Sequence, residues 1–584
     1  MKKTMILLLT AVLVFSAFAG CSKTETPATT TAATTAPTTA PTTAPTTAPT
    51  VSPTLSPEEQ QAMDEMYAQM MQEAANGGMI PDGSYDNGDL GQQQTVYADP
   101  SSSKFQVGYA KVDITPSTSL KLPLIGNNDE KTRVATGILT RLYATCAAMT
   151  DEKGTTVLLF GMDAHGIPQD FLAAARSAIT KATGIKGKYI QMTGSHTHQA
   201  PPITKNGYGY SDSTKHMNDV VKKCVEAAQK ALADRKPALM YTAFTQVEGI
   251  NFCRYTYLED GTFMGSQKGS GTADYYSTAE RPDDLLQIVK FDRAGGNDVL
   301  LVNWQAHYRG NPSGQYTLYS ADYMGVMRKE LEKSNYETVF LLGASGNLAC
   351  RTDAIKAVYT NSDKNGSYVA VGEELASSAI SALTYASAAK LGKIHLEEKT
   401  YHISTNSNDY KLAAFGIGDV GFAMMPYEPF QSLGMKVRKE SPYKMTLIGT
   451  CANGNGGNFY LPDAKAYDAK SPYGVSKKYV EGDEQKFHKQ YISMLKTCFT
   501  KNGNSAVSKP DGYIINTTTF KDPNTYTSPK NLEKVKNGLY RIDVKRNGKA
   551  AVLLVKSESL AKQLLKKSSF KVITDTRSVV TAIG

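Results

Sequence analysis

Hydrophobic and polar positions follow two different periods between residue 105 and about residue 500. Residues 155–162 form an apolar run, which is typical of a buried strand. Residues 169–184 place apolar side chains three and four positions apart, which predicts a helix. A further strand is predicted at 188–192, so this segment has the order strand, helix, strand.

The same order recurs further along the chain. A strand is predicted at 299–304, a helix at 321–333 and another strand at 339–342. Strands that alternate with helices indicate an α/β domain, here with mixed sheets and helices. In such sheets, functional side chains collect just beyond the carboxyl ends of the strands.

Histidines stand just past three of these strands. His196 and His198 follow one strand, His307 follows another, and His165 follows a third together with an aspartate. We therefore expect these side chains to lie near a common site. The remaining histidines are expected at surface or core positions: His216, His395, His402 and His488.

The end of the chain has a different pattern. Residues 539–544 and 550–555 flank an Asn-Gly pair, which predicts a β-hairpin. A short helix is predicted at 557–567, and one or two strands at 569–582. Residues 506–584 are therefore expected to form a small α+β or β-rich domain.

The first residues indicate export. Residues 1–20 combine a short basic start with an apolar run and end in Phe-Ala-Gly before Cys21. This pattern resembles a bacterial lipobox, with cleavage before Cys21 and lipid on its thiol, which anchors a protein to the membrane. An ordinary secretory signal peptide is the alternative, and either one predicts an extracytoplasmic protein at the bacterial cell surface.

Residues 21–104 are expected to be a linker. A Thr-Thr-Ala-Pro repeat fills much of the first half and offers almost no large apolar side chains to bury. Repeated proline favours an extended chain, suited to a stalk. A short helix is predicted at 56–76, and the catalytic domain is expected at 105–505.

Charge and cysteine content exclude some functions. The net charge of +9 on 584 residues comes without arginine clusters or interleaved aromatic motifs, so nucleic-acid binding is not predicted. Six cysteines follow Cys21 at wide, irregular spacing and without a Cys-x-x-Cys pair. Free buried thiols are favoured over disulfides, and a cysteine-rich metal site is not expected.

The His-Thr-His stretch is the main candidate for chemistry. Two side chains at i and i+2 share a face in an extended chain, but past the end of a strand they can diverge. His196 could then bind a metal while His198 faces a substrate, since imidazole is the commonest zinc ligand. The alternative is a pair of histidines bonded to loop carbonyls. No His-Glu-x-x-His or Gly-x-Ser-x-Gly motif is present, so a zincin protease and a serine hydrolase elbow are not supported.

Several stretches resemble the catalytic domain of the neutral/alkaline (non-lysosomal) ceramidases, a family of zinc-dependent amidases. The resemblance covers about residues 105–480, with the motifs in matching order. The similar stretches are 105–116, 140–144, 194–201 (GSHTHQAP), 303–307 (NWQAH), 423–430 (AMMPYEPF) and 452–462 (ANGNGGNFYLP).

The resemblance implies a zinc site made by His196, His307, Glu428 and Tyr460. Two neutral imidazoles, a carboxylate and a phenolate can hold Zn²⁺ and leave room for water.

The resemblance also implies residues that face the substrate. His198 would hydrogen-bond the developing oxyanion or exchange a proton. Arg254 is similar to a family arginine that assists there, and Tyr473 to a family tyrosine near the substrate. The alternatives are a surface ion pair for Arg254 and a packing role for Tyr473.

Three positions depart from the family pattern. Ala349 stands where ceramidases carry a catalytic serine, and neither Ser345 nor Cys350 is expected to replace it. Tyr427 stands where the family more often has glycine, which is expected to reshape the pocket. The stretch 453–460 is about two residues longer than usual. These departures bear on the substrate more than on the metal.

The expected function is hydrolysis of an N-acyl (C–N amide) bond by metal-activated water, on an N-acyl sphingoid lipid or another small N-acyl amide. One alternative is a non-catalytic ligand-binding surface lipoprotein that kept the fold, for which Ala349 is the main argument. Another is a metal-dependent esterase with the same site. The residue pattern leaves the oligomeric state open.

Overall fold

The computed structural model describes most of the chain beyond residue 94. The described residues are 95–126, 129, 131–247, 250–253, 256–257, 263–264, 282–308, 316–350, 367–402, 409–454, 460–464, 466, 481–505, 509–510, 513, 524–534, 540–546, 549–555, 558–566 and 568–572. The predicted signal peptide, Cys21, the expected Thr/Pro-rich linker and the helix predicted at 56–76 lie outside these residues.

A mixed sheet of nine strands is the largest element of the described residues. The strands follow the order β13-β11-β10-β6-β1-β3-β4-β5, and β15 also pairs with β6. The pairs β4–β5 and β11–β13 are parallel, whereas the other pairs are antiparallel. The strands are β1 (Gln106–Asp113), β3 (Tyr143–Thr150), β4 (Thr156–Met162), β5 (Ile190–Gly194), β6 (Lys236–Gln246), β10 (Leu285–Arg293), β11 (Asp298–Trp304), β13 (Tyr336–Leu342) and β15 (Ser387–Ala389).

A second sheet has four strands in the order β16-β17-β18-β20. These strands are β16 (Ile394–His402), β17 (Asp409–Ile417), β18 (Val420–Met424) and β20 (Met445–Gly449).

The two sheets pack face to face, and the alternation of side chains along their strands explains why. In β4, Leu159 belongs to the core shared with the second sheet, whereas its neighbour Phe160 belongs to the core on the opposite face. In β18, Phe422 points into the shared core and Ala423 into the core on the other side. Both faces of both sheets are therefore covered, which is why these strands are apolar throughout instead of alternating with polar residues.

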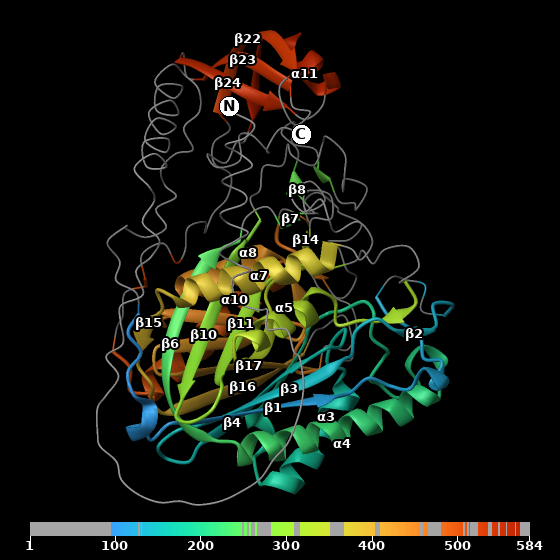
Figure 1. Ribbon diagram of the computed structural model, residues 1–584, viewed down its shortest axis with the longest axis vertical. Helices are drawn as coiled ribbons and strands as arrows, with labels where there is room; N and C mark the ends of the chain where they lie inside the picture. The colour runs from blue at the N-terminus through green and yellow to red at the C-terminus, as the bar shows by residue number, and fades with distance from the viewer. Residues whose placement is uncertain are drawn as a thin grey trace, which may run out of the picture. The chain divides into compact units, whose positions relative to one another are not determined.

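Helices cover the outer faces. In Figure 1, α3 and α4 lie along β1, β3 and β4, and α5 and α7 lie along β6, β10 and β11. α8 and α10 share a core with β17 and β18. The result is a four-layer arrangement of helices, sheet, sheet and helices. The helices are α3 (Gln169–Thr183), α4 (Asp212–Ala233), α5 (Asp322–Lys333), α7 (Ser367–Leu383), α8 (Gln431–Glu440) and α10 (Asp483–Lys501), with short 3-10 turns η1 (Pro100–Ser102), η2 (Thr118–Leu120), η3 (Gly187–Tyr189) and η4 (Gly207–Gly209).

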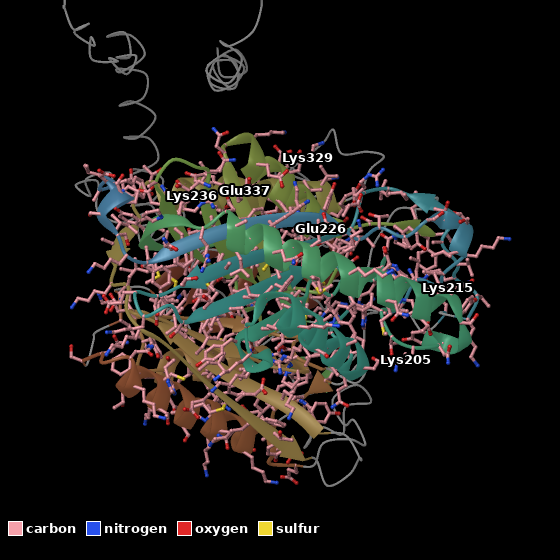
Figure 2. All side chains as sticks on the ribbon, turned by 90° about the horizontal axis from the view of Figure 1, so that it is seen from below. Lys205, Lys215, Glu226, Lys236, Lys329 and Glu337 are labelled. Carbon is pink, nitrogen blue, oxygen red and sulfur yellow. The ribbon has the colours of Figure 1, made fainter. Side chains whose placement is uncertain are left out.

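Helix α4 shows how the helical period places the core. Val220, Cys224 and Ala227 recur every three or four residues and are fully buried. Lys215 and Glu226 lie on the outer face (Figure 2), where 77% and 39% of their side chains are exposed. The helix is thus amphipathic and fits one side of the sheet.

Short ladders and a C-terminal unit complete the described fold. The ladders pair β2 (Gly137–Ile138) with β12 (Leu318–Tyr319), β7 (Asn251–Cys253) with β14 (Leu348–Cys350), β8 (Thr256–Tyr257) with β9 (Phe263–Met264), and β19 (Glu428–Pro429) with β21 (Tyr460–Leu461). The C-terminal sheet has the order β24-β23-β22-β25, with β22 (Asn524–Lys534), β23 (Tyr540–Arg546), β24 (Lys549–Val555), β25 (Ser569–Val572) and the helix α11 (Glu558–Leu565).

The predicted elements are confirmed with small shifts. β4, α3, β11, α5 and β13 fall on the predicted segments, and β23 and β24 form the predicted hairpin. The strand predicted at 188–192 is in part wrong, because residues 187–189 form a 3-10 turn and the strand begins at Ile190.

The predicted fold class is confirmed as α/β with mixed sheets and a small α+β unit at the end. The six cysteines after Cys21 are buried thiols that form no disulfide bond, as favoured from their spacing. Among the residues described, no helix has both the length and the apolar character needed to cross a membrane.

Candidate metal centre

The loop after β5 carries His196 and His198. Because β4 and β5 are parallel, residues 163–165 lie beside this loop, and the N–H of His196 donates to the carbonyl of Ala164 at 2.9 Å. His196 has a φ of +63°, which is uncommon for a residue with a side chain and often marks a functional site. The rings of His196 and His198 stand nearly perpendicular to each other, with an interplanar angle of 82°.

Three buried acceptor atoms converge at one point. The Nε2 atoms of His196 and His307 lie 2.8 Å apart, and Glu428 Oε2 lies 2.9 Å from the Nε2 of His307 and 3.3 Å from that of His196. No more than 3% of any of these three residues is exposed. His307 follows β11 and Glu428 begins β19, so distant parts of the chain meet here.

The other ring nitrogens set the tautomers. His196 Nδ1 lies 2.8 Å from the carbonyl oxygen of His165, and His307 Nδ1 lies 2.9 Å from that of Ser345. A carbonyl can only accept, so each Nδ1 donates, and a neutral ring then presents a lone pair at Nε2. Metal-ligating histidines are held by such bonds in other proteins.

Two lone pairs and a carboxylate oxygen repel one another unless a cation lies among them. Ligand atoms about 2.0–2.2 Å from a tetrahedral zinc ion lie roughly 3.3 Å from one another, which is close to the separations found here. Glu428 Oε1 is buried and has no hydrogen-bond partner within the described part of the chain. The donor set therefore fits a divalent cation such as zinc.

The pKa values of His196 and Glu428 are shifted in directions that agree with a cation site. Burial alone would lower the pKa of His196, but the Glu428 carboxylate and the Cys451 sulfur together outweigh it and raise that pKa well above its usual range. Burial would raise the pKa of Glu428, but the two imidazoles hold it well below its usual range. Both shifts favour a positive charge, whether a proton or a metal ion, between these residues.

Tyr460 lies next to this cluster. β19 and β21 pair in parallel, with Glu428 opposite Tyr460, and the ring of Tyr460 lies 6.0 Å from that of His307, centroid to centroid. The fold thus brings together the four residues expected to bind zinc.

His198 and His165 lie beside the three acceptors. The ring of His198 is 4.9 Å from that of His196 and 5.9 Å from that of His307. The ring of His165 is 4.2 Å from His196 and 5.1 Å from His198, which confirms the expectation that it lies near the site. The nitrogens of His165, His196 and His198 form a second group that could hold a cation.

Gly126 closes one side of His198. Its φ is +105°, and a Cβ added there would lie 2.6 Å from His198 Nδ1. A side chain at this position would collide with the imidazole.

Sequence reasoning missed two residues at the site. The buried Arg133 donates from Nη2 to the carbonyls of Ile125, at 3.0 Å, and His198, at 2.9 Å. The Sγ of Cys451 lies 3.4 Å from His196 Nδ1. Both residues stand in loops without a hydrophobic period and far from the His-Thr-His motif in the sequence. Nothing in the sequence therefore indicated that they lie at the site.

Ala349 lies beside His307. It forms an isolated parallel bridge with His307, and in the β7–β14 ladder it pairs with Phe252. β7 ends one residue before Arg254. Arg254 and Tyr473, expected to face the substrate, lie outside the described residues.

Two expectations about neighbouring residues have different outcomes. Tyr427 does not face the histidines: it is fully buried in the core with α10, 4.7 Å from the ring of Phe487, so the expectation that it reshapes the pocket is wrong. Tyr427 lies in the bend before β19, and its side chain packs into that core while Glu428 faces the histidines. Cys350 points into the core shared with α5 and α7, as expected.

The fold matches that of two solved ceramidase structures. Neutral ceramidase from Pseudomonas aeruginosa is 13% identical, with a TM-score of 0.56 and coverage of 76% of this chain and 84% of that chain. A ceramidase complexed with C2 is also 13% identical, with a TM-score of 0.54 and the same coverage. No protein-family model and no curated protein matches the chain. At this identity the matches show the fold, which is the ceramidase-like fold predicted from the sequence resemblance.

Proposed function

We propose that this chain is a zinc-dependent hydrolase of N-acyl amide bonds. The observation that carries the proposal is the convergence of His196, His307 and Glu428 as three buried acceptors. Its ceramidase-like fold supports an N-acyl lipid, or another small N-acyl amide, as the substrate class.

His196, His307, Glu428 and Tyr460 would hold the zinc ion. When bound, zinc would polarise the scissile carbonyl and supply a water molecule of lowered pKa. The ligands themselves are oriented by the chain, since backbone carbonyls accept from both Nδ1 atoms.

His198 is proposed to donate a hydrogen bond to the oxyanion of the tetrahedral intermediate. It is 4% exposed, so bulk water does not compete for such a bond, which makes it stronger than in solution. Arg133 holds the carbonyl of His198 and so restricts its position. Arg254 and Tyr473 are proposed as further substrate contacts on the strength of the sequence resemblance alone.

We propose a cell-surface location with a lipid anchor at Cys21, a linker at 21–104, a catalytic domain at 105–505 and a small domain at 506–584. The basis is the sequence pattern at the start of the chain and the change of composition near residues 105 and 505.

Ala349 supports a second candidate function. Its methyl group can neither attack a carbonyl nor donate a hydrogen bond, and it lies beside His307. A chain that kept the fold and the metal site without turnover would be a ligand-binding lipoprotein.

The test is hydrolysis of a fluorescent N-acyl sphingosine by the purified full chain, with the zinc content measured on the same sample. The proposal predicts turnover that is lost on chelation and restored by zinc. The variant H196A should lose both zinc and turnover. Zinc without turnover on any N-acyl amide or ester would favour the binding protein, and turnover by zinc-free H196A would refute the metal-dependent reaction.

A further inference from the structure

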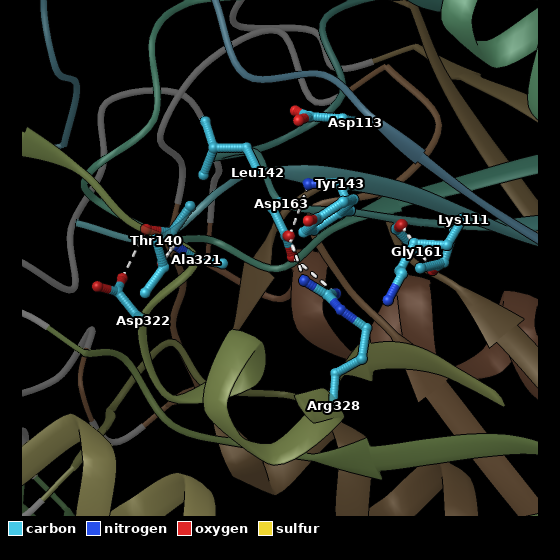
Figure 3. A network of polar contacts seen from close by, with 12 residues as sticks. Lys111, Asp113, Thr140, Leu142, Tyr143, Gly161, Asp163, Ala321, Asp322 and Arg328 are labelled. Atoms are coloured by element: carbon cyan, nitrogen blue, oxygen red, sulfur yellow. Dashed lines mark hydrogen bonds and ion pairs between the residues drawn. The ribbon is translucent and has the colours of Figure 1, made fainter. Parts of the chain in front are cut away.

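Asp322 lies beneath the His196–His198 loop. It is the first residue of α5, it is 1% exposed, and its φ is +52°, in the left-handed region that residues with side chains rarely adopt. The N–H of Asp322 donates to Ser320 Oγ at 3.0 Å, and the neighbouring N–H of Ala321 donates to Thr140 Oγ1 at 2.8 Å (Figure 3). The start of the helix is therefore held in an unusual conformation by several side chains.

The hydroxyl of Thr197 has one proton but lies within hydrogen-bond distance of two acceptor oxygens. Its Oγ1 lies 2.7 Å from the carbonyl oxygen of Ser320 and 2.6 Å from Asp322 Oδ2, and it accepts the N–H of Gln199 at 3.1 Å. A hydroxyl donates one proton. If Asp322 is ionised, two acceptors at these short distances compete for that proton.

A proton on Asp322 removes the conflict. A carbonyl oxygen carries no hydrogen, so of the two acceptors only the carboxyl group can become a donor. Thr197 then donates to Ser320 and accepts from Asp322, and every short contact has one hydrogen.

The surroundings of Asp322 agree with a neutral acid. Burial is the largest influence and, with the charge of Asp163, raises the pKa of Asp322 to about 7. The Thr197 hydroxyl, the N–H of His198 and the charge of Arg133 act in the opposite direction. The other titratable groups that face it are Tyr323, Tyr368 and Cys350, which add no positive charge.

We propose that Asp322 is a positioning residue which, as a neutral carboxylic acid, donates a hydrogen bond to Thr197 and fixes the loop that carries His196 and His198. Thr197 stands between the two histidines, whose rings lie 4.9 Å apart, centroid to centroid, at the candidate metal centre. The same loop is tied to the Asp322 segment a second time, because the N–H of Ser320 donates to the carbonyl of Gln199 at 3.1 Å. The effect on catalysis rests on the proposed function, whereas the hydrogen bond itself does not.

The substitution D322N tests the protonation state. Asparagine has the same shape, tolerates the left-handed conformation, and its amide can donate to Thr197 at every pH. The melting temperature of the full chain should match that of the wild type near pH 4 and exceed it near pH 8. Between these values the unfolded wild type releases the Asp322 proton above about pH 3.9, whereas the folded chain keeps it until about pH 7, so the wild type loses stability. The matched control is D163N, which removes a buried carboxylate that accepts from Arg328 and should lower the melting temperature at both pH values.

One result of the D322N experiment would contradict the inference. If D322N is less stable than the wild type near pH 8, Asp322 works as a charged acceptor and the inference is wrong. Because this readout needs no turnover, it stands apart from the proposed function: a chain that hydrolyses nothing can still show the predicted pH dependence.

A second pair of variants tests positioning. T197V removes the hydroxyl and should weaken zinc binding, by about tenfold, in competition with a chelator, while T197S keeps the hydroxyl and should restore it. Equal zinc affinity and equal rates for T197V and the wild type would overturn the positioning role even if Asp322 is neutral. T197V leaves the buried partners of the hydroxyl unpaired, whereas T197S keeps them paired, so the melting temperatures of both variants are measured to separate loss of folding from loss of positioning.

Discussion

The buried ion pair between Asp163 and Arg328 gives a prediction whose size follows from the structure. Arg328 on α5 donates from Nη2 to Asp163 Oδ2 at 2.6 Å and from Nη1 to Oδ1 at 3.2 Å (Figure 3). Only 6% and 3% of the two side chains are exposed. The N–H of Tyr143 also donates to Asp163 Oδ2, at 2.8 Å.

The variant R328M keeps much of the apolar stem and removes the charge. Asp163 would stay buried and would lose its two charge-assisted hydrogen bonds from Arg328. Of the three hydrogen bonds just described, only the one from the N–H of Tyr143 would remain. Such bonds contribute about 1.5–3 kcal/mol each, and breaking one side of a buried pair costs about 3–5 kcal/mol in total. We therefore expect R328M to lower the free energy of unfolding by about 3–5 kcal/mol.

Removal of the Arg328 side chain should also affect the candidate metal site. The residues after Asp163 supply the carbonyls of Ala164 and His165, which hold the backbone and the ring of His196. R328M should therefore also weaken zinc binding.

Urea unfolding of the full chain measures the change, and R141M is the matched control. Arg141 pairs with Asp113 at 2.7 Å, but 60% of its side chain is exposed, so its loss should cost less than about 1 kcal/mol. The double variant D163N/R328M should be more stable than R328M, because no uncompensated charge remains. If R328M costs no more than R141M, the reasoning about the buried charge is refuted.

Three further changes probe the site itself. G126A places a Cβ 2.6 Å from His198 Nδ1, so it should lower kcat with little change in zinc content; an unchanged rate would mean that His198 does not contribute to turnover. A349S adds a hydroxyl beside His307 and should raise hydrolysis of an N-acyl sphingosine by about tenfold, whereas no change would show that the alanine is not the limiting feature. In the chelated protein the pKa of His196 is raised by Glu428, so the stability from this pair is complete below about pH 6.5 and is lost as the pH rises through the raised pKa. Thermal unfolding with and without chelator should show zinc compensating for that loss at alkaline pH, and a chelated protein whose stability does not fall there would argue against the pairing.

The local elements could be predicted because their patterns are local. The apolar run of β4 and the three- and four-residue spacing of α3 each depend on a few neighbouring residues, and α3 ends at Gly184, whose φ of +75° suits a glycine after a helix. The His-Thr-His motif, together with the family resemblance, was enough to propose the metal ligands.

The rest depends on contacts between distant residues. The role of Asp322 requires the start of α5 to meet Thr197, and that of Arg133 requires its loop to meet the carbonyl of His198. Neither pair is close in sequence. The direction of Tyr427 could not be predicted either, because it depends on how α8 and α10 pack against the second sheet.

The central claim is the metal site, and zinc content tests it most directly. Purified full-length chain, dialysed without chelator after loading, should retain about one zinc ion per chain by elemental analysis, and H307A should retain almost none. H216A is the control, because His216 is similarly buried on α4 but belongs to neither group of described residues that could hold a metal ion. Zinc bound equally by H307A and the wild type, or absent from the loaded wild type, would contradict the account.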